Sequence, residues 1–252
     1  MQFNSETISN GVLEREFAVS GVPGVMWSPA STTAPAPLVL MGHPGGLHKK
    51  AQGLVARAIH LVTTRGFHVA SIDAPGHGDR ARSPEDTQWV DEMQRARARG
   101  QSLRSIVSAF NGSIAERAVP EWRATLDDLQ SLPEIDADRP VGYNGMTLAT
   151  EIGARLAVAD ARIGAVVLGS AFASEPLMAF ARCITAPVQY LLSWDDPEID
   201  RESGLALFDA FASSEKTLHA NPGPHSRVPS FEVEDGARFF ARHLLPPEYS
   251  AE

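Results

Sequence analysis

The stretch PVGYNGMTLATEIGARLAV, from Pro140 to Val158, predicts a buried strand, a sharp turn and an amphipathic helix in direct succession. A hydroxyl-bearing residue, Thr147, lies at the tip of the turn, and Gly145 precedes it by two positions. A strand that passes through a tight turn into a helix is the unit from which parallel α/β sheets are built. This stretch therefore sets the expected fold class and provides one candidate functional residue.

Further apolar runs alternate with helical patterns along the chain. The predicted strands are residues 37–42, 67–73, 139–145, 163–170, 187–194 and a shorter one at 216–220. The predicted helices are residues 49–66, 122–132, 150–160 and 203–213. Continuous apolar strands between amphipathic helices indicate a doubly wound, mostly parallel sheet with both faces covered. Residues 11–19 and 21–30 alternate instead, so we expect antiparallel edge strands there.

The segment 83–116 interrupts this alternation, because it is polar, rich in arginine and contains Gly100 and Gly112. We interpret it as a small helical cap inserted over the mouth of the sheet. Its apolar side chains are spaced to line the inner face of the cap: Trp89, Met93, Leu103, Ile106 and Phe110. They either pack the cap onto the core or contact an apolar substrate, and Trp89 and Met93 are the candidates for substrate contact.

The composition is that of a globular protein, with 43% hydrophobic and 21% charged residues among 252. No linker divides the chain, so we expect a single domain over residues 1–252. The net charge of -9 and the scattered Lys and Arg residues argue against a nucleic-acid partner. The single cysteine, Cys183, excludes an internal disulfide, and we expect it to be a buried core residue.

The sequence contains neither a signal peptide nor a membrane span by its pattern. The first ten residues show no basic start followed by an apolar run. No apolar stretch approaches the roughly 20 residues needed to cross a bilayer. We therefore expect a soluble cytoplasmic protein without a membrane partner.

Side chains suited to catalysis follow several predicted strands. In doubly wound sheets the active groups gather at the carboxyl ends of the strands, so we expect Thr147, Asp196 and His225 to meet there. A histidine takes the proton of a hydroxyl nucleophile, and a carboxylate fixes the tautomer of the histidine and stabilises its imidazolium form. These residue types predict acyl transfer through a hydroxyl nucleophile.

In the order nucleophile, acid, histidine, the chain resembles the α/β-hydrolase superfamily and, within it, the compact esterases related to dienelactone hydrolases. The resemblance covers residues 12–244. It implies a carboxylic ester or related acyl compound as the small-molecule substrate and an acyl-enzyme at Thr147. It also implies an oxyanion hole formed by the N–H groups of Leu148 and Gly45, because Pro44 has no N–H to donate. Dienelactone hydrolases themselves have a cysteine on this turn, which is absent here.

The turn departs from the Gly-x-Ser-x-Gly signature of the superfamily, because residues 145–149 read Gly-Met-Thr-Leu-Ala. A nucleophile on this turn normally has a positive φ, where a β-branched residue is disfavoured, at a cost of about 1–3 kcal/mol. Three interpretations of Thr147 follow: a working nucleophile, a site for acyl transfer, lactone formation or cyclisation, or a protein that only binds a ligand. We expect the first, because Oγ1 can still reach His225 and threonine is an accepted nucleophile in other folds. The presence of both the acid and the histidine argues against the third.

Two assignments have a competitor nearby. Asp195 competes with Asp196 for the role of the acid, and we favour Asp196 because related sequences place the acid three residues after the position of Ser193. His219 competes with His225 for the role of the base. The strand 216–220 would bury His219, whereas His225 follows a Gly/Pro loop that can direct it toward the site.

The remaining polar residues near the strand ends have structural interpretations. We expect His43 to brace the oxyanion turn or to contact substrate, and Met146, beside the nucleophile, is a second candidate for substrate contact. Asp73, Asp79 and Arg80 should form hydrogen bonds or an ion pair within their turn. The histidines show no close metal-ligand spacing, so we expect no metal and no cofactor.

Overall fold

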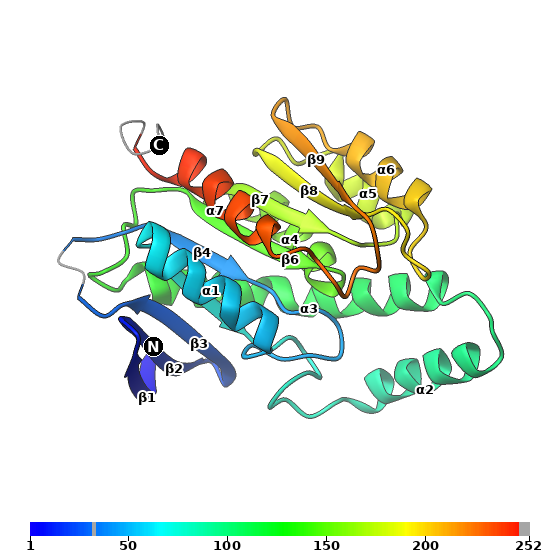
Figure 1. The fold of residues 1–252 in the computed structure, drawn as a ribbon. Coiled ribbons are helices and arrows are strands. Elements are labelled where there is room, and N and C mark those ends of the chain that lie inside the picture. Colours follow the sequence, from blue (N-terminus) through cyan, green and yellow to red (C-terminus); the bar gives the residue numbers. More distant parts are fainter. Residues whose placement is uncertain (32–33, 247–252) are drawn as a thin grey trace.

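The computed structural model describes residues 1–31 and 34–246 and contains a nine-stranded sheet with helices on both faces (Figure 1). The strands are β1 Gln2–Ser9, β2 Val12–Val19, β3 Val22–Pro29, β4 Leu38–Met41, β5 His68–Ile72, β6 Val141–Met146, β7 Ile163–Gly169, β8 Val188–Ser193 and β9 Lys216–Asn221. The helices are α1 Gln52–Arg65, α2 Pro84–Ala98, α3 Arg104–Gln130, α4 Leu148–Ala159, α5 Glu175–Ala181, α6 Arg201–Ala210 and α7 Phe231–Leu244.

The sheet has the order β1-β2-β3-β5-β4-β6-β7-β8-β9. The strands from β4 to β9 run parallel, and β1, β2 and β3 form an antiparallel meander whose last strand pairs antiparallel with β5. The predicted mostly parallel, doubly wound sheet is confirmed. Since parallel strands end at one edge, the turns after β4, β5, β6, β8 and β9 share the same side of the molecule.

Successive side chains along the parallel strands point to opposite faces of the sheet and pack into two separate hydrophobic cores. Leu38 and Leu40 belong to the cluster formed with α3, α4, α5 and α6, whereas Val39 and Met41 belong to the cluster formed with α1 and α7. Figure 1 shows α1 and α7 on one face of the sheet and α3 and α4 on the other. Burial on both faces explains why these strands are apolar without alternation in the sequence.

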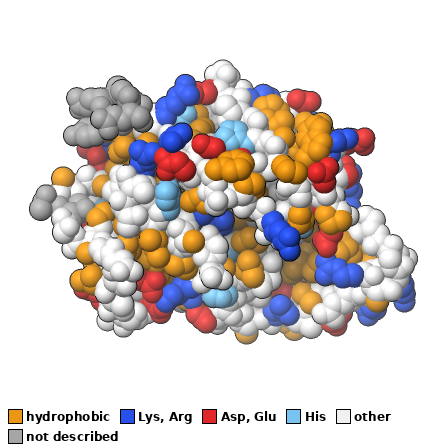
Figure 2. Space-filling model, in the orientation of Figure 1, with side chains coloured by type: hydrophobic (Ala, Val, Ile, Leu, Met, Phe, Trp, Pro, Cys, Tyr) orange, Lys and Arg blue, Asp and Glu red, His pale blue; other side chains and the backbone are white. Residues whose placement is uncertain are grey.

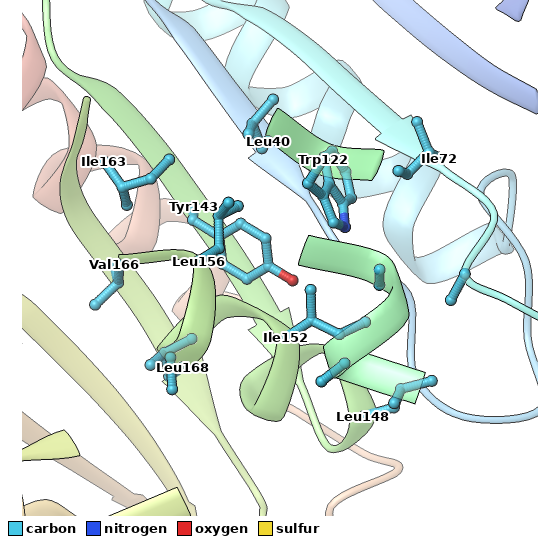
Figure 3. Close-up of a cluster of buried hydrophobic side chains, with 14 of the residues drawn as sticks. Leu40, Ile72, Trp122, Tyr143, Leu148, Ile152, Leu156, Ile163, Val166 and Leu168 are labelled. Atoms are coloured by element: carbon cyan, nitrogen blue, oxygen red, sulfur yellow. The ribbon is translucent and has the colours of Figure 1, made fainter. Parts of the chain in front are cut away.

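The core behind β6 is built around two aromatic rings (Figure 3). Trp122 of α3 meets Tyr143 of β6 edge-on, with ring centroids 6.0 Å apart, and both are fully buried. Gly153 of α4 lies against the Tyr143 ring so closely that a Cβ there would stand 2.2 Å from Tyr143 Cε1. The helix after the central turn is therefore seated directly on the sheet.

The segment predicted as a cap contains α2 and the first half of α3, and α2 extends away from the sheet (Figure 1). Helix α2 begins with a capping box, in which Ser83 Oγ accepts the N–H of Asp86 and the Asp86 carboxylate accepts the N–H of Ser83. The predicted helix 122–132 is not separate from this segment. Helix α3 continues through Pro120, because its buried face extends along the whole second half of the helix.

Some features differ from the sequence-based expectations. Strand β1 and helices α5 and α7 were not predicted as elements. Cys183 is exposed in the turn after α5, so the expectation of a buried thiol was wrong. Acidic and basic side chains are mixed over the face shown in Figure 2, and no helix within residues 1–31 and 34–246 is long and apolar enough to cross a bilayer.

Candidate active site

The turn between β6 and α4 has the strained backbone that the sequence predicts. Thr147 has φ 54° and ψ −113°, and its N–H donates to the carbonyl of Gly169 at 3.0 Å. The turn is also tight, because a Cβ at Gly145 would stand 2.6 Å from the carbonyl oxygen of Ala149. A β-branched residue adopts such a φ only when the surrounding structure enforces it.

Two buried hydroxyl groups hold this elbow. Thr150 Oγ1 lies 2.6 Å from the carbonyl oxygen of Gly169 and 3.1 Å from that of Gly145, and it accepts the N–H of Gly169 at 3.0 Å. The hydroxyl of Tyr143 donates to the carbonyl of Ala149 at 2.9 Å. These hydrogen bonds connect the ends of β6 and β7 to the first turn of α4, and they offset the strain at the tip.

Asp196 and His225 form a pair at the ends of β8 and β9. His225 Nδ1 lies 2.7 Å from Asp196 Oδ2, which also accepts the backbone N–H of His225. Asp196 Oδ1 accepts the N–H groups of Glu198 and Ile199 at 2.8 and 2.7 Å. The Asp196 side chain is fully buried. Burial alone would raise the pKa of Asp196, but the N–H groups of His225, Ile199 and Glu198 outweigh it and hold that pKa below its usual value.

The neighbouring candidates lie apart from this pair. Asp195 is exposed and has no hydrogen bond or ion pair with any residue of the described chain. His219 is half-buried, not buried as expected, because β9 is an edge strand, and its Nδ1 lies 2.7 Å from Glu232 Oε2. Within the part of the chain that the structure describes, no hydrogen bond joins the Thr147 hydroxyl to the His225 imidazole, whose side chain is 26% exposed.

The turn after β4 lies against the first residue of α4. A Cβ at Gly45 would stand 3.8 Å from Leu148 Cβ. His43 braces this turn, because its Nδ1 lies 2.9 Å from the carbonyl oxygen of Pro44 and its Nε2 accepts the N–H of Ala74 at 3.0 Å. These roles place the proton on Nδ1. Burial lowers the pKa of His43 to about 4, so the ring is neutral near pH 7.

The chain is similar over 97% of its length to a cold-adapted esterase from an Arctic intertidal metagenomic library, in a complex with polyethylene glycol. The two share 32% sequence identity with a TM-score of 0.76, and all of the esterase chain is covered. The chain belongs to the α/β-hydrolase-type esterases.

More distant solved structures share the fold of this esterase family. An acetyl xylan esterase from Paenibacillus sp. R4 is 14% identical over 96% of this chain and 88% of its own, with a TM-score of 0.66. Est1E from Butyrivibrio proteoclasticus, with ferulic acid bound, is 14% identical over 90% and 98%, also with a TM-score of 0.66. No family model and no curated protein sequence matches the chain.

In this esterase-type chain, the turn after β5 is an ion-pair network, as the sequence predicts. Asp73 is buried and accepts the N–H of Lys49, the Lys49 ammonium and the N–H of Asp79. Lys49 also pairs with Asp79, and Arg80 binds Glu121 with both terminal nitrogens at 2.7 Å. The network fixes the turns after β4 and β5 relative to each other.

At the end of β9, where the loop that carries His225 begins, a buried glutamate makes hydrogen bonds that the sequence did not indicate. Glu232 is buried at the start of α7 and accepts from Asn221 Nδ2 at 2.6 Å while contacting His219. His219, Glu232 and Asp235 are also spaced to hold a cation, with one ligand atom from each within 4.8 Å of the others. The amphipathic pattern of residues 231–244 was the available signal for α7, but nothing in the sequence linked it to Asn221.

The predicted substrate contacts pack against protein. Trp89 stacks on Phe110 with centroids 6.3 Å apart, and Trp89 and Met93 lie on the core cluster of α3 and α4. Met146 is buried, and its sulfur lies 2.9 Å from the position of a Cβ at Gly169. These side chains therefore contribute to the structure around the site.

Proposed function

We propose that the chain hydrolyses carboxylic esters, with Thr147 as the nucleophile, His225 as the general base and Asp196 as its partner. The observation that carries the proposal is the Asp196–His225 hydrogen bond of 2.7 Å on the strand edge where Thr147 has its positive φ. The printed descriptions of the similar proteins as esterases support the choice of ester substrates.

In the proposed first step, His225 Nε2 takes the proton of the Thr147 hydroxyl while Oγ1 attacks the ester carbonyl carbon. The carbonyl oxygen becomes an oxyanion that accepts the N–H groups of Leu148 and Gly45. Collapse of this intermediate releases the alcohol, which receives its proton from His225, and leaves an acyl group on Thr147. Water then attacks the acyl group by the same route, and Thr147 regains its proton.

Asp196 has a defined part in this sequence. Its buried carboxylate keeps the His225 Nδ1–H in place, so that Nε2 faces the nucleophile as the base, and it stabilises the imidazolium that forms. The N–H groups of Glu198 and Ile199 hold the carboxylate ionised at neutral pH. Proton transfer requires Thr147 Oγ1 to come within hydrogen-bond reach of His225, and such contacts are often long in enzymes without substrate.

The same proposal assigns the surrounding parts of the chain. In this proposal the chain is a single domain, and its cap is the helical insertion between β5 and β6, formed by α2 and the first half of α3. The methyl group of Thr147 crowds the position that the substrate carbonyl must occupy. We therefore expect a lower rate of ester hydrolysis than a serine would give at this position.

The initial rate of hydrolysis of para-nitrophenyl acetate tests the proposal, with the natural chain, Thr147→Ala, Thr147→Ser and the control Thr217→Ala, which removes an exposed threonine of β9. We expect turnover by the natural chain, a loss of about 100-fold or more in Thr147→Ala, and equal or higher activity in Thr147→Ser. Thr217→Ala should match the natural chain.

Two results would overturn the hydrolytic proposal. Equal activity in Thr147→Ala and the natural chain would remove Thr147 from the mechanism. An inactive natural chain with an active Thr147→Ser variant would show that threonine selects against hydrolysis, in favour of transfer to another acceptor or cyclisation.

A further inference from the structure

An open cavity of about 430 Å³ lies beside the proposed oxyanion turn. One wall is formed by Gly46, Leu47 and His48, which directly follow Gly45, and the other by the turn 76–82 after β5. Its volume is within the range of about 300–1,000 Å³ that is usual for small-molecule sites. Because Gly46 directly follows Gly45, a substrate whose carbonyl oxygen accepts the Gly45 N–H would have its reacting group next to this wall.

The cavity lining is cationic in a protein with a net charge of -9. It includes Arg80, Arg82 and two histidines, and no acidic residue. Arg80 is engaged, because it binds the Glu121 carboxylate and the carbonyl of Asp73. Arg82 is exposed and forms no ion pair or hydrogen bond with any residue in 1–31 and 34–246.

The acidic groups closest to this wall are already paired with other cations. Asp79 pairs with Lys49 at 2.5 Å, and Asp86 binds Arg117 at 2.6 Å. The stem of Arg82 lies on the backbone of the same turn, with its Cγ 3.4 Å from the position of a Cβ at Gly76. The stem of Arg82 is therefore placed at the cavity wall, and its guanidinium group, which has no partner in the described chain, is available to a ligand.

A second donor faces the cavity from the opposite wall. His48 Nδ1 accepts the N–H of Lys50 at 3.3 Å, so the neutral ring carries its proton on Nε2. A planar guanidinium and one additional N–H suit a carboxylate, which accepts several hydrogen bonds at two oxygens. The exposed Leu47 provides an apolar lip beside them.

We propose that this cavity binds a carboxylate group of the ester substrate, with Arg82 as the principal cation and His48 as the second donor. The proposal rests on the proposed ester hydrolysis and names its substrate class: esters that carry a free carboxylate, either on the acyl side, as in half-esters of dicarboxylic acids, or on the alcohol side.

The proposed carboxylate site is tested by measuring kcat/KM for two pairs of esters, each with one charged and one neutral member. Para-nitrophenyl hemisuccinate is compared with para-nitrophenyl valerate for the acyl side, and meta-carboxyphenyl acetate with phenyl acetate for the alcohol side. We expect the natural chain to favour the carboxylate in one pair. Arg82→Gln should lower that charged-to-neutral ratio about tenfold, through KM, since a charge-assisted hydrogen bond is of this strength. Arg82→Lys should restore part of the ratio.

The control Arg99→Gln removes an exposed arginine that follows α2, away from the cavity lining, and should leave the ratio as in the natural chain. The proposal is overturned if neither pair shows a preference for the carboxylate, or if Arg82→Gln and Arg99→Gln change the ratio equally.

Calorimetric titration of the natural chain with glutarate separates this proposal from the proposed function. Glutarate binding that weakens about tenfold in Arg82→Gln, in a chain that hydrolyses no ester, would support the cavity and overturn the hydrolase. Ester hydrolysis without Arg82-dependent glutarate binding would support the hydrolase and overturn the proposed carboxylate site. Arg82-dependent binding of inorganic phosphate, with none of glutarate, would overturn the assignment of a carboxylate.

Discussion

Thr147 lies on the turn after the central strand β6, which is hydrogen-bonded into the buried core, whereas Asp196 and His225 lie on loops at the end of the sheet. The elbow is held by the hydroxyls of Thr150 and Tyr143, both fully buried. The acid is held by the backbone N–H groups of Glu198 and Ile199 in its own loop and by that of His225, and the base is held by the carboxylate of the acid. The comparison indicates that substitutions near the elbow will change stability and activity together, while those in the loops will change activity more than stability.

The largest expected effect is on the loop side. Asp196→Asn removes the charge that orients His225, and kcat/KM for para-nitrophenyl acetate should fall by about 10³–10⁴-fold, the scale seen when a triad acid is replaced by its amide. The control is Asp195→Asn, which alters the exposed neighbour. A larger loss in Asp195→Asn than in Asp196→Asn would reverse the assignment of the acid.

On the elbow side, Thr150→Val retains the shape of the side chain but removes the hydroxyl. The N–H of Gly169 would lose its acceptor in a buried site, so the free energy of unfolding should fall by about 1–3 kcal/mol. The value of kcat should fall as well, because the elbow is less firmly held. Denaturant titration gives the first quantity and initial rates the second. Thr150→Ser keeps the hydroxyl, so equal losses in both variants would contradict this role.

The free energy of unfolding should also depend on pH, because the chain contains the buried histidines His43 and His68. Burial lowers the pKa values of His43 and His68 to about 4, below the ordinary value of 6.5. The unfolded chain therefore binds protons that the folded chain does not, and stability is lost as pH falls from about 6.5 to about 4. The slope is at most about 1.4 kcal/mol per pH unit for each histidine.

Chemical denaturation at intervals across this pH window measures the slope. His68→Gln should reduce it by the share of one histidine. The slope that remains belongs to His43 and to His77 and His243, whose pKa values burial also lowers. Carboxylates with lowered pKa values, such as Asp196, lose their contribution only at lower pH. A free energy of unfolding that stays constant over the window would contradict the neutral state of both rings.

The smallest expected effect concerns the contact between α3 and the loop after Asp196. Arg104 pairs with Asp200, and both side chains are about half exposed, at 47% and 48%. Arg104→Gln should therefore lower the free energy of unfolding by less than about 1 kcal/mol, and by less still at high salt. A loss as large as that of Thr150→Val would mean that the loop side depends on this ion pair for its stability.

The parallel sheet was predictable because its strands are buried on both faces and appear as continuous apolar runs. Strand β1 was not, since it is almost entirely exposed and has no apolar periodicity. Helix α3 was predicted in two parts because the polar segment 83–116, with Gly112, was interpreted as an insertion separate from the helix 122–132, although the packing of its buried face maintains one helix.

For the candidate site, the sequence identified the residues that follow strands, because topology brings strand ends together. Asp195 and Asp196 are adjacent, so the choice between them depends on which side chain turns inward, and this is set by the N–H groups of residues 198 and 199. The contribution of Thr150 was hidden for a similar reason. A hydroxyl in the first turn of a helix gives no sequence signal that it reaches across to the end of β7.

The order of strands in the sheet also has a consequence for how the chain folds. Strands β1, β2 and β3 pair with their neighbours in sequence, so this meander can form from local contacts while the chain is being synthesised. The parallel strands pair only after each crossover is complete, and His225 follows the last of them. A chain interrupted after β8 would therefore already have the elbow, yet it would lack the base and present an unpaired strand edge to other chains.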